Sequence, residues 1–317
     1  MSEPARTRKP DLTKGLDRVQ KFGTILLPHD AEEPILAAGP RLAIYEWLTE
    51  LRARAELEAV NLKPRATALL YGPPGTGKTT LAHHLAARLG LALVSVQAER
   101  LMSPQFGGSS NNIGELFDGL AEAEHGCVLL LDEIDSIGSM RLSDDSSAGR
   151  ERNMVLTTLL TRVEAFRGMA IAATNRKDQL DPALWRRFGM QISVDLPDGE
   201  ERFAILKRYA APFDFSEDGL DILTDLTQGA SPALLRQLME GLKRALVLHP
   251  RLGLKIDDVA VVFRAITSAV APHPDLPQPP LWKSFGAHAG QLRKIPWPPA
   301  DQRKPERAPA EKKGGAR

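Results

Sequence analysis

Gly72-Pro73-Pro74-Gly75-Thr76-Gly77-Lys78-Thr79 fits the pattern GxxxxGK[ST] of a phosphate-binding loop. An apolar run, Ala68–Tyr71, precedes it and a helical pattern opens at Thr80, which is the context that the motif requires. The glycines let backbone N–H groups converge on a phosphate, and the start of the following helix adds a favourable dipole. Lys78 is then placed to contact the β- and γ-phosphates of ATP, and the Thr79 hydroxyl to bind Mg²⁺. A plain glycine-rich turn is the alternative, which the flanking pattern disfavours.

A second apolar run, Val128–Leu131, ends in two acids, Asp132 and Glu133. A buried strand would bring Asp132 to the metal and would place Glu133 beside the γ-phosphate. Glu133 could then orient and activate the attacking water. An apolar strand that ends in two acids is common and can be purely structural, but its occurrence together with the phosphate-binding loop favours the functional interpretation.

A third pattern follows the apolar run Met169–Thr174. Asn175 comes at the end of this expected strand, where its amide could hold the water or the γ-phosphate, although a lone asparagine is usually a turn residue. Arg186 and Arg187 lie in a short helical pattern and would ordinarily form part of a solvated helix face.

Short apolar stretches alternate with helical patterns through the first two thirds of the chain, after a first helix expected over 41–60. Such alternation predicts an α/β fold in which helices cover both faces of a parallel sheet. The expected strands are 68–71, 91–96, 128–132, 169–174 and 191–194, and the helices between them are 80–89, 113–124, 154–163 and 182–187. Four further helices, 200–211, 218–226, 232–248 and 256–269, predict a small helical bundle.

These patterns divide the chain into four parts. We expect an N-terminal extension over 1–40, which reads as an extended lead-in because prolines punctuate it, and a nucleotide-binding α/β domain over 41–198. A helical lid follows over 199–270. The last part, 271–317, contains ten of the 24 prolines without periodicity, so we expect a disordered, basic tail.

Composition excludes several classes of protein. The 317 residues include 43% hydrophobic and 26% charged residues with a net charge of +1, which is typical of a soluble globular protein. No apolar run approaches the ~20 residues of a membrane-spanning helix, so no membrane association is expected. The single cysteine, Cys127, cannot form an internal disulfide, which favours the cytoplasm. The excess of basic residues lies mainly in the tail, so nucleic acid is not expected as the main partner.

The order of GPPGTGKT, LLLDEID, AATNRKDQLDPAL and RRF resembles the AAA family of ATPases, a branch of the AAA+ superfamily of P-loop NTPases. The region around Arg186 is similar to the arginine-finger region of spastin- and katanin-like members, and the resemblance covers 41–270. It implies that Asn175 is the sensor asparagine and that Arg186 and Arg187 are arginine fingers. In this family the fingers act on ATP held by a neighbouring subunit, which implies a homo-oligomeric ring, usually a hexamer.

The resemblance also assigns two less specific positions. Phe106, between small residues, matches the aromatic position of the first pore loop, although an isolated phenylalanine is more often a core residue. Gly229 and Ala230 match the contact between the lid and the adenine ring. No segment before the phosphate-binding loop matches the family's other adenine contact.

Together these features predict an ATP-hydrolysing remodeller that pulls a polypeptide through the pore of a ring. The alternative is an ATP-switched loader or assembly factor for a protein or nucleoprotein complex that does not thread its partner. A non-enzymatic scaffold is disfavoured because Glu133, Asn175 and both arginines are present. We expect a protein substrate or adaptor to bind the N-terminal extension or the tail, where Trp282 and Trp297 either anchor an acidic partner or pack back on the lid.

Overall fold

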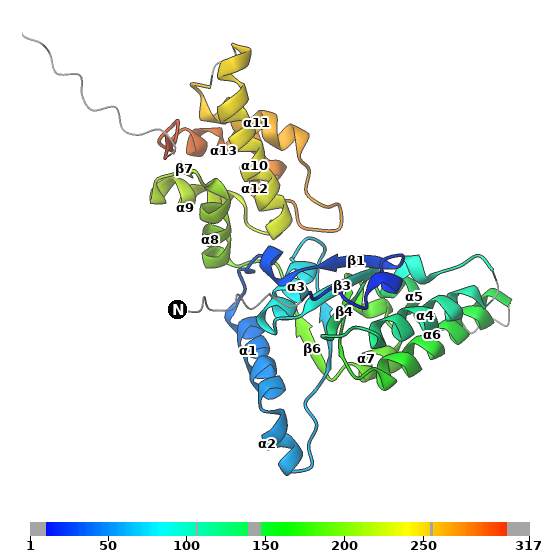
Figure 1. Ribbon diagram of the computed structural model, residues 1–317. Helices are drawn as coiled ribbons and strands as arrows, with labels where there is room; N and C mark the ends of the chain where they lie inside the picture. Colours follow the sequence, from blue (N-terminus) through cyan, green and yellow to red (C-terminus); the bar gives the residue numbers. More distant parts are fainter. Residues whose placement is uncertain (1–10, 106, 139–146, 254–255, 303–317) are drawn as a thin grey trace, which may run out of the picture. The chain divides into compact units, whose positions relative to one another are not determined.

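The computed structural model describes residues 11–105, 107–138, 147–253 and 256–302 (Figure 1). Its internal contacts divide the chain between Leu196 and Pro197 into two compact units. This division lies two residues before the end expected for the nucleotide-binding domain at Asp198.

The first unit contains a six-stranded sheet in the order β1-β3-β4-β5-β2-β6. Five strands run parallel, which confirms the predicted fold class, and each of them begins and ends within one residue of its expected bounds. The strands are β1 (Gly23–Leu26), β2 (Thr67–Tyr71), β3 (Ala92–Gln97), β4 (Cys127–Asp132), β5 (Met169–Thr174) and β6 (Met190–Ser193).

Both faces of this sheet are buried, because alternate side chains of β1 to β5 enter two separate apolar clusters, whereas the edge strand β6 contributes only to the second. Leu129 and Leu131 belong to one cluster and Leu130 to the other, and all three are fully buried. The first cluster includes residues of α4 (Gly108–Ala121), α6 (Ser147–Ala165) and α7 (Pro182–Arg187), and the second includes residues of α1 (Ala38–Arg52) and α3 (Lys78–Arg88) (Figure 1). The short helices α2 (Arg54–Ala59) and α5 (Asp135–Gly138) complete the unit, and no described helix has the length and apolar character that a bilayer crossing requires.

The N-terminal extension differs from the extended lead-in that we expected over 1–40. Its strand β1 pairs antiparallel with β3 at the edge of the sheet, and two 3-10 turns flank it, η1 (Asp17–Val19) and η2 (Pro28–Asp30). Leu16 and Val19 are fully buried and Phe22 nearly so. These residues recur at a spacing of three and fill the apolar cluster beside α4, a pattern that the many prolines of this segment obscure.

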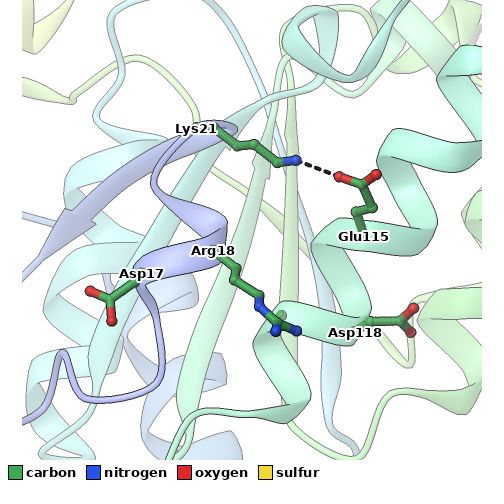
Figure 2. A pocket seen from close by; sticks show the side chains of 6 residues that line it. Asp17, Arg18, Lys21, Glu115 and Asp118 are labelled. Atoms are coloured by element: carbon green, nitrogen blue, oxygen red, sulfur yellow. Dashed lines mark hydrogen bonds and ion pairs between the residues drawn. The ribbon is translucent and has the colours of Figure 1, made fainter.

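Charged side chains of the same segment pair with α4 and with the residues that directly follow it. Lys14 contacts Glu124 at 2.7 Å, and Arg18 and Lys21 contact Glu122 and Glu115. Figure 2 shows Lys21 directed at Glu115 across a hollow that Arg18 and Asp118 also line. Exposed pairs of this kind contribute about 0–1 kcal/mol each, so burial of the apolar residues does more to hold the segment.

The second unit contains the four predicted helices, α8 (Gly199–Ala210), α9 (Glu217–Leu226), α10 (Pro232–Leu248) and α11 (Val259–Ala269). Each begins directly after a residue whose side chain accepts a hydrogen bond from the first turn. Asp198, Ser216, Ser231 and Asp258 have this role, and such caps fix the point at which a helix begins.

The disorder that we expected over 271–317 is wrong for residues 271–302. This segment forms two short helices, α12 (Pro280–Lys283) and α13 (Phe285–Leu292), and a strand, β8 (Ala300–Asp301), that pairs with β7 (Phe213–Asp214). Leu281 and Leu292 are fully buried and Ile295 is 3% exposed.

Both tryptophans of the tail are bound to the lid. Trp282 donates its indole N–H to the Val270 carbonyl at 2.6 Å, and Trp297 donates to the Ile256 carbonyl. The proline content of the tail predicted disorder, but proline content takes no account of a few apolar side chains that become buried against a neighbouring bundle.

Candidate nucleotide site

The phosphate-binding loop connects β2 to α3 through three glycines with positive φ angles, 148° at Gly72, 74° at Gly75 and 92° at Gly77. A Cβ atom on Gly72 would lie 2.2 Å from the Val194 carbonyl oxygen, so only glycine fits there. At Gly77, which precedes the first residue of α3, a Cβ atom would meet nothing within 4 Å. Glycine is thus favoured at 77 by its left-handed backbone and not by lack of space, and it leads directly into the start of α3, where backbone N–H groups can bind a phosphate.

Lys78 lies folded against its own loop. Its side chain is 7% exposed and its ammonium donates to the carbonyls of Gly72 and Pro73 at 2.9 and 2.7 Å. Burial lowers the pKa of Lys78 to about 8, although the negative charges of Asp132 and Asp135 oppose the change. A buried cation held by two carbonyls and the more distant Thr76 hydroxyl, all of them neutral groups, would gain from a nearby anion, so this side chain fits a phosphate group.

The two predicted metal ligands lie side by side. Thr79, at the start of α3, donates its hydroxyl to the Asp132 carboxylate at 2.6 Å, and Asp132 is the last residue of β4. Oxygen atoms of this kind suit Mg²⁺, which takes few ligands from a protein and completes its shell with waters and phosphates. The described residues contain no cluster of three or more histidine, cysteine or acidic side chains that could hold a metal alone. The donor set thus fits Mg²⁺ bound together with a nucleotide.

Glu133 leaves the sheet through an unusual backbone conformation. Its φ angle is 52°, one of two positive values among the described non-glycine residues, and its side chain is exposed. The next residue, Ile134, donates its N–H to the Ala173 carbonyl at 3.0 Å and so holds the segment against β5. A left-handed residue other than glycine costs about 1–3 kcal/mol and is often found at functional sites.

Asn175 lies at the same edge of the sheet as the phosphate-binding loop. Tyr71 and Thr174, the last residues of β2 and β5, are register partners, so Gly72 and Asn175 follow paired residues. β4 lies on the other side of β5, which brings the Asp132 end of that strand to this edge as well. The structure therefore brings together the three strand ends that the sequence singled out.

Two residues that we had not predicted connect these strand ends. Thr174 is 1% exposed and donates its hydroxyl to the Asp135 carboxylate at 2.7 Å, while its own oxygen accepts the N–H of Arg176 at 2.9 Å. This link ties the residues around Asn175 to the segment that follows Glu133. The only sequence signal was Asp135, the third acid of the run LLLDEID, which we had not used.

Arg186 and Arg187 lie on α7, whose first turn is capped by the buried Asp181. Arg187 pairs with Glu164 at 3.0 Å, and both side chains are about half exposed. Arg186 is exposed and has no ion pair among the described residues. No described hydrogen bond or ion pair joins either arginine to the phosphate-binding loop.

Residues 68–196 match the model of the ATPase family associated with various cellular activities, abbreviated AAA. The chain belongs to the AAA family. The match runs from β2 to the end of the first unit, so it covers Lys78, Asp132, Glu133, Asn175 and both arginines. The family resemblance that these motifs suggested is thereby confirmed.

Curated relatives of this AAA protein include two archaeal sequences named proteasome-activating nucleotidase. That of Methanopyrus kandleri is 39% identical over 69% of the chain and 53% of the relative, and that of Thermococcus gammatolerans is 34% identical over 73% and 64%. The 26S proteasome regulatory subunit 10B homolog A of Arabidopsis thaliana is 36% identical over 61% of the chain and 52% of the relative. The chain thus spans about half to two thirds of the length of these relatives.

Three of the predicted AAA site residues lie outside the matched segment or the described residues. Gly229, with a φ of 82°, and the fully buried Ala230 form the turn before α10 in the second unit. Their contact with adenine stays a prediction. Phe106 lies outside the residues that the structure describes, so its role in a pore loop also stays a prediction.

Proposed function

We propose that the chain is an ATPase that binds ATP with Mg²⁺ and works as a ring-forming protein remodeller in the cytoplasm. The observation that supports this proposal most directly is the site at one edge of the sheet. There the buried Lys78 ammonium lies in the phosphate-binding loop, and the Thr79 hydroxyl contacts Asp132 at 2.6 Å. Glu133 directly follows that carboxylate and is exposed.

Each residue has a separate role in this proposal. Lys78 and the loop N–H groups bind the phosphates, and Thr79 and Asp132 hold the metal, which neutralises phosphate charge when bound. Glu133 accepts a proton from the attacking water, and Asn175 orients that water or the γ-phosphate. Arg186 and Arg187 approach the nucleotide of the next subunit, a contribution worth about 10³–10⁵ in rate when an arginine is supplied in trans.

The partners follow from the same reasoning. The relatives are named for activating or regulating the proteasome, which supports a hexameric ring that acts on protein substrates. We extend this to threading of a polypeptide by the loop that contains Phe106. A loader that switches its partner without threading is the alternative.

Two substitutions separate binding from hydrolysis. Lys78→Ala should abolish ATP binding because a phosphate-binding cation is lost. Glu133→Gln should keep binding and lose turnover, because the metal ligands remain while activation of water fails. Binding is measured with a fluorescent ATP analogue and turnover by phosphate release. Turnover at the wild-type rate in Glu133→Gln would contradict the assignment of the base.

A second measurement separates threading from loading. Casein, an unstructured polypeptide, should stimulate the ATPase if the ring engages extended chains, and Phe106→Ala should remove that stimulation. Met102→Ala, which removes a side chain 39% exposed in the same stretch, is the matched control. Stimulation that survives in Phe106→Ala would favour the loader.

A further inference from the structure

Lys177, Tyr71 and Trp185 form a contact cluster at the carboxyl edge of the sheet. The rings of Tyr71 and Trp185 lie with their centroids 5.2 Å apart at an angle of 50°. The Lys177 ammonium lies 5.5 Å from the centroid of the Tyr71 ring, within the range of a cation–π interaction. The aromatic rings are partly buried and the lysine is exposed.

Each member of this cluster adjoins a different part of the proposed site. Tyr71 ends β2 directly before Gly72, and its carbonyl accepts the Val194 N–H at 2.8 Å. Trp185 lies on α7 directly before Arg186. Lys177 begins the 3-10 turn η4 (Lys177–Gln179), two residues after the predicted sensor Asn175. The phosphate-binding loop, the sensor and the arginine helix of one chain are therefore joined by side chains.

Trp185 differs from the other three tryptophans of the chain. Trp47, Trp282 and Trp297 each donate the indole N–H to a backbone carbonyl, which fixes the ring in place. Within the part of the chain that the structure describes, the Trp185 indole has no such bond, and its ring packs against that of Tyr71. Trp185 also packs against the apolar cluster that includes Leu184 of the same helix, so its contact with Tyr71 joins the end of β2 to the buried side of α7.

We infer that Trp185 is a positioning residue that links the phosphate-binding loop, through Tyr71, to the arginine pair of the same subunit. Lys177 restrains Tyr71 from the side of the sensor. The inference rests on the proposed function, in which Arg186 and Arg187 serve the next subunit. Occupancy of one site would thus set the position of the arginines offered to its neighbour.

Assemblies mixed from two variants test whether Trp185 positions the arginines that its own subunit supplies to the next. A donor subunit carries Glu133→Gln, so that it holds ATP without hydrolysing it and supplies arginines. An acceptor carries Arg186→Ala with Arg187→Ala, so that it can hydrolyse ATP but supplies no arginines. Trp185→Leu in the donor should lower the ATPase activity of the mixture at least about tenfold, since a displacement of about 1 Å can cost about a hundredfold in rate. The same substitution in the acceptor should leave the activity close to that of the parent mixture, and Trp185→Phe in the donor should restore it.

The controls keep a folding defect apart from a loss of position. Retained activity with the Trp185→Leu acceptor shows that the variant folds, and Tyr45→Leu in the donor, at a side chain 67% exposed on α1, should have no effect. Equal losses with the donor and acceptor variants, or no loss with the donor, would overturn the link. An inactive parent mixture would instead overturn the proposed in-trans arginines, and the inference with them.

A spectroscopic measurement tests the link from loop to ring without assembly. In the Glu133→Gln protein, ATP should change the tryptophan emission, because the nucleotide displaces the loop next to Tyr71. The change should vanish when Trp185→Phe is added, and also in Lys78→Ala. An ATP-dependent change of the same size in the protein without Trp185 would overturn the inference.

Discussion

Lys78 has properties that depend on the fold around it more than on its own chemistry. A free lysine is protonated throughout the neutral range, whereas burial in the loop lowers the pKa of Lys78 to about 8. The apo site thus contains a cation that is close to losing its charge. Phosphate binding needs the protonated form, so the affinity of the site for ATP is coupled to pH.

The sign of this coupling gives a prediction. Between pH 7 and pH 9 the free Lys78 loses most of its proton, so the affinity for ATP should fall by about tenfold over this interval. Lys78→Arg keeps its charge at all these pH values and should show a much flatter dependence. Titration of a fluorescent ATP analogue at a series of pH values measures both. An affinity of the wild-type protein that stays level across this interval would contradict the prediction.

At the scale of elements, the packing of the tail in the second unit differs most from the disorder that its composition predicted. The side chains of Leu281, Leu292 and Ile295 are buried although prolines lie on both sides of the stretch that contains them, at 280 and 296. Arg293 adds an ion pair with Asp258, the residue that caps α11, at 2.7 Å. The tail residues 271–302 are therefore expected to stabilise the bundle rather than to remain available for a partner.

Two leucine-to-alanine substitutions, one at a buried and one at an exposed position, test this packing. Leu292→Ala removes a fully buried side chain on α13 and should lower the free energy of unfolding by about 2–5 kcal/mol. Leu252→Ala changes a side chain that is 68% exposed and should shift it by no more than about 0.5 kcal/mol. Urea denaturation followed by circular dichroism measures both values. Equal stability of the two variants would show that the tail does not belong to the core.

At the scale of the whole molecule, the proposed site is incomplete in one chain. The loop, the metal ligands and Glu133 meet at one sheet edge, whereas Arg186 has no ion pair among the described residues and Arg187 pairs with Glu164. An arginine that is exposed beside such a site is available to a second copy of the chain. Activity should therefore depend on assembly.

This dependence is measured by dilution. The ATPase rate per subunit should rise with protein concentration and level off once rings are complete, and light scattering on the same samples reports the mass of the assembly. Arg186→Ala with Arg187→Ala should assemble similarly but stay at the low rate of the dilute protein. A rate per subunit that is the same for monomers and assemblies would exclude arginines supplied in trans.

The amino-acid sequence by itself determined the parallel sheet and the chemistry at its carboxyl edge. Glycines at 72, 75 and 77, the pair Lys78-Thr79 and the acids 132–133 form short motifs that are recognisable along the chain, before their distant contacts are known. The four strands β2 to β5 were likewise predictable, because a strand buried on both faces is a largely apolar run, and β6 was recognisable from alternating burial of Met190 and Ile192.

Only the tertiary structure decided which other segments belong to the two cores and how the site residues are joined. Leu16 and Val19 near the N-terminus and Leu292 in the tail complete their cores in segments where prolines and charges hide the pattern. The bond from Thr174 to Asp135 and the contact of Tyr71 with Trp185 join residues 39 and 114 positions apart. Periodicity describes neighbours along the chain, whereas these contacts depend on where distant segments meet.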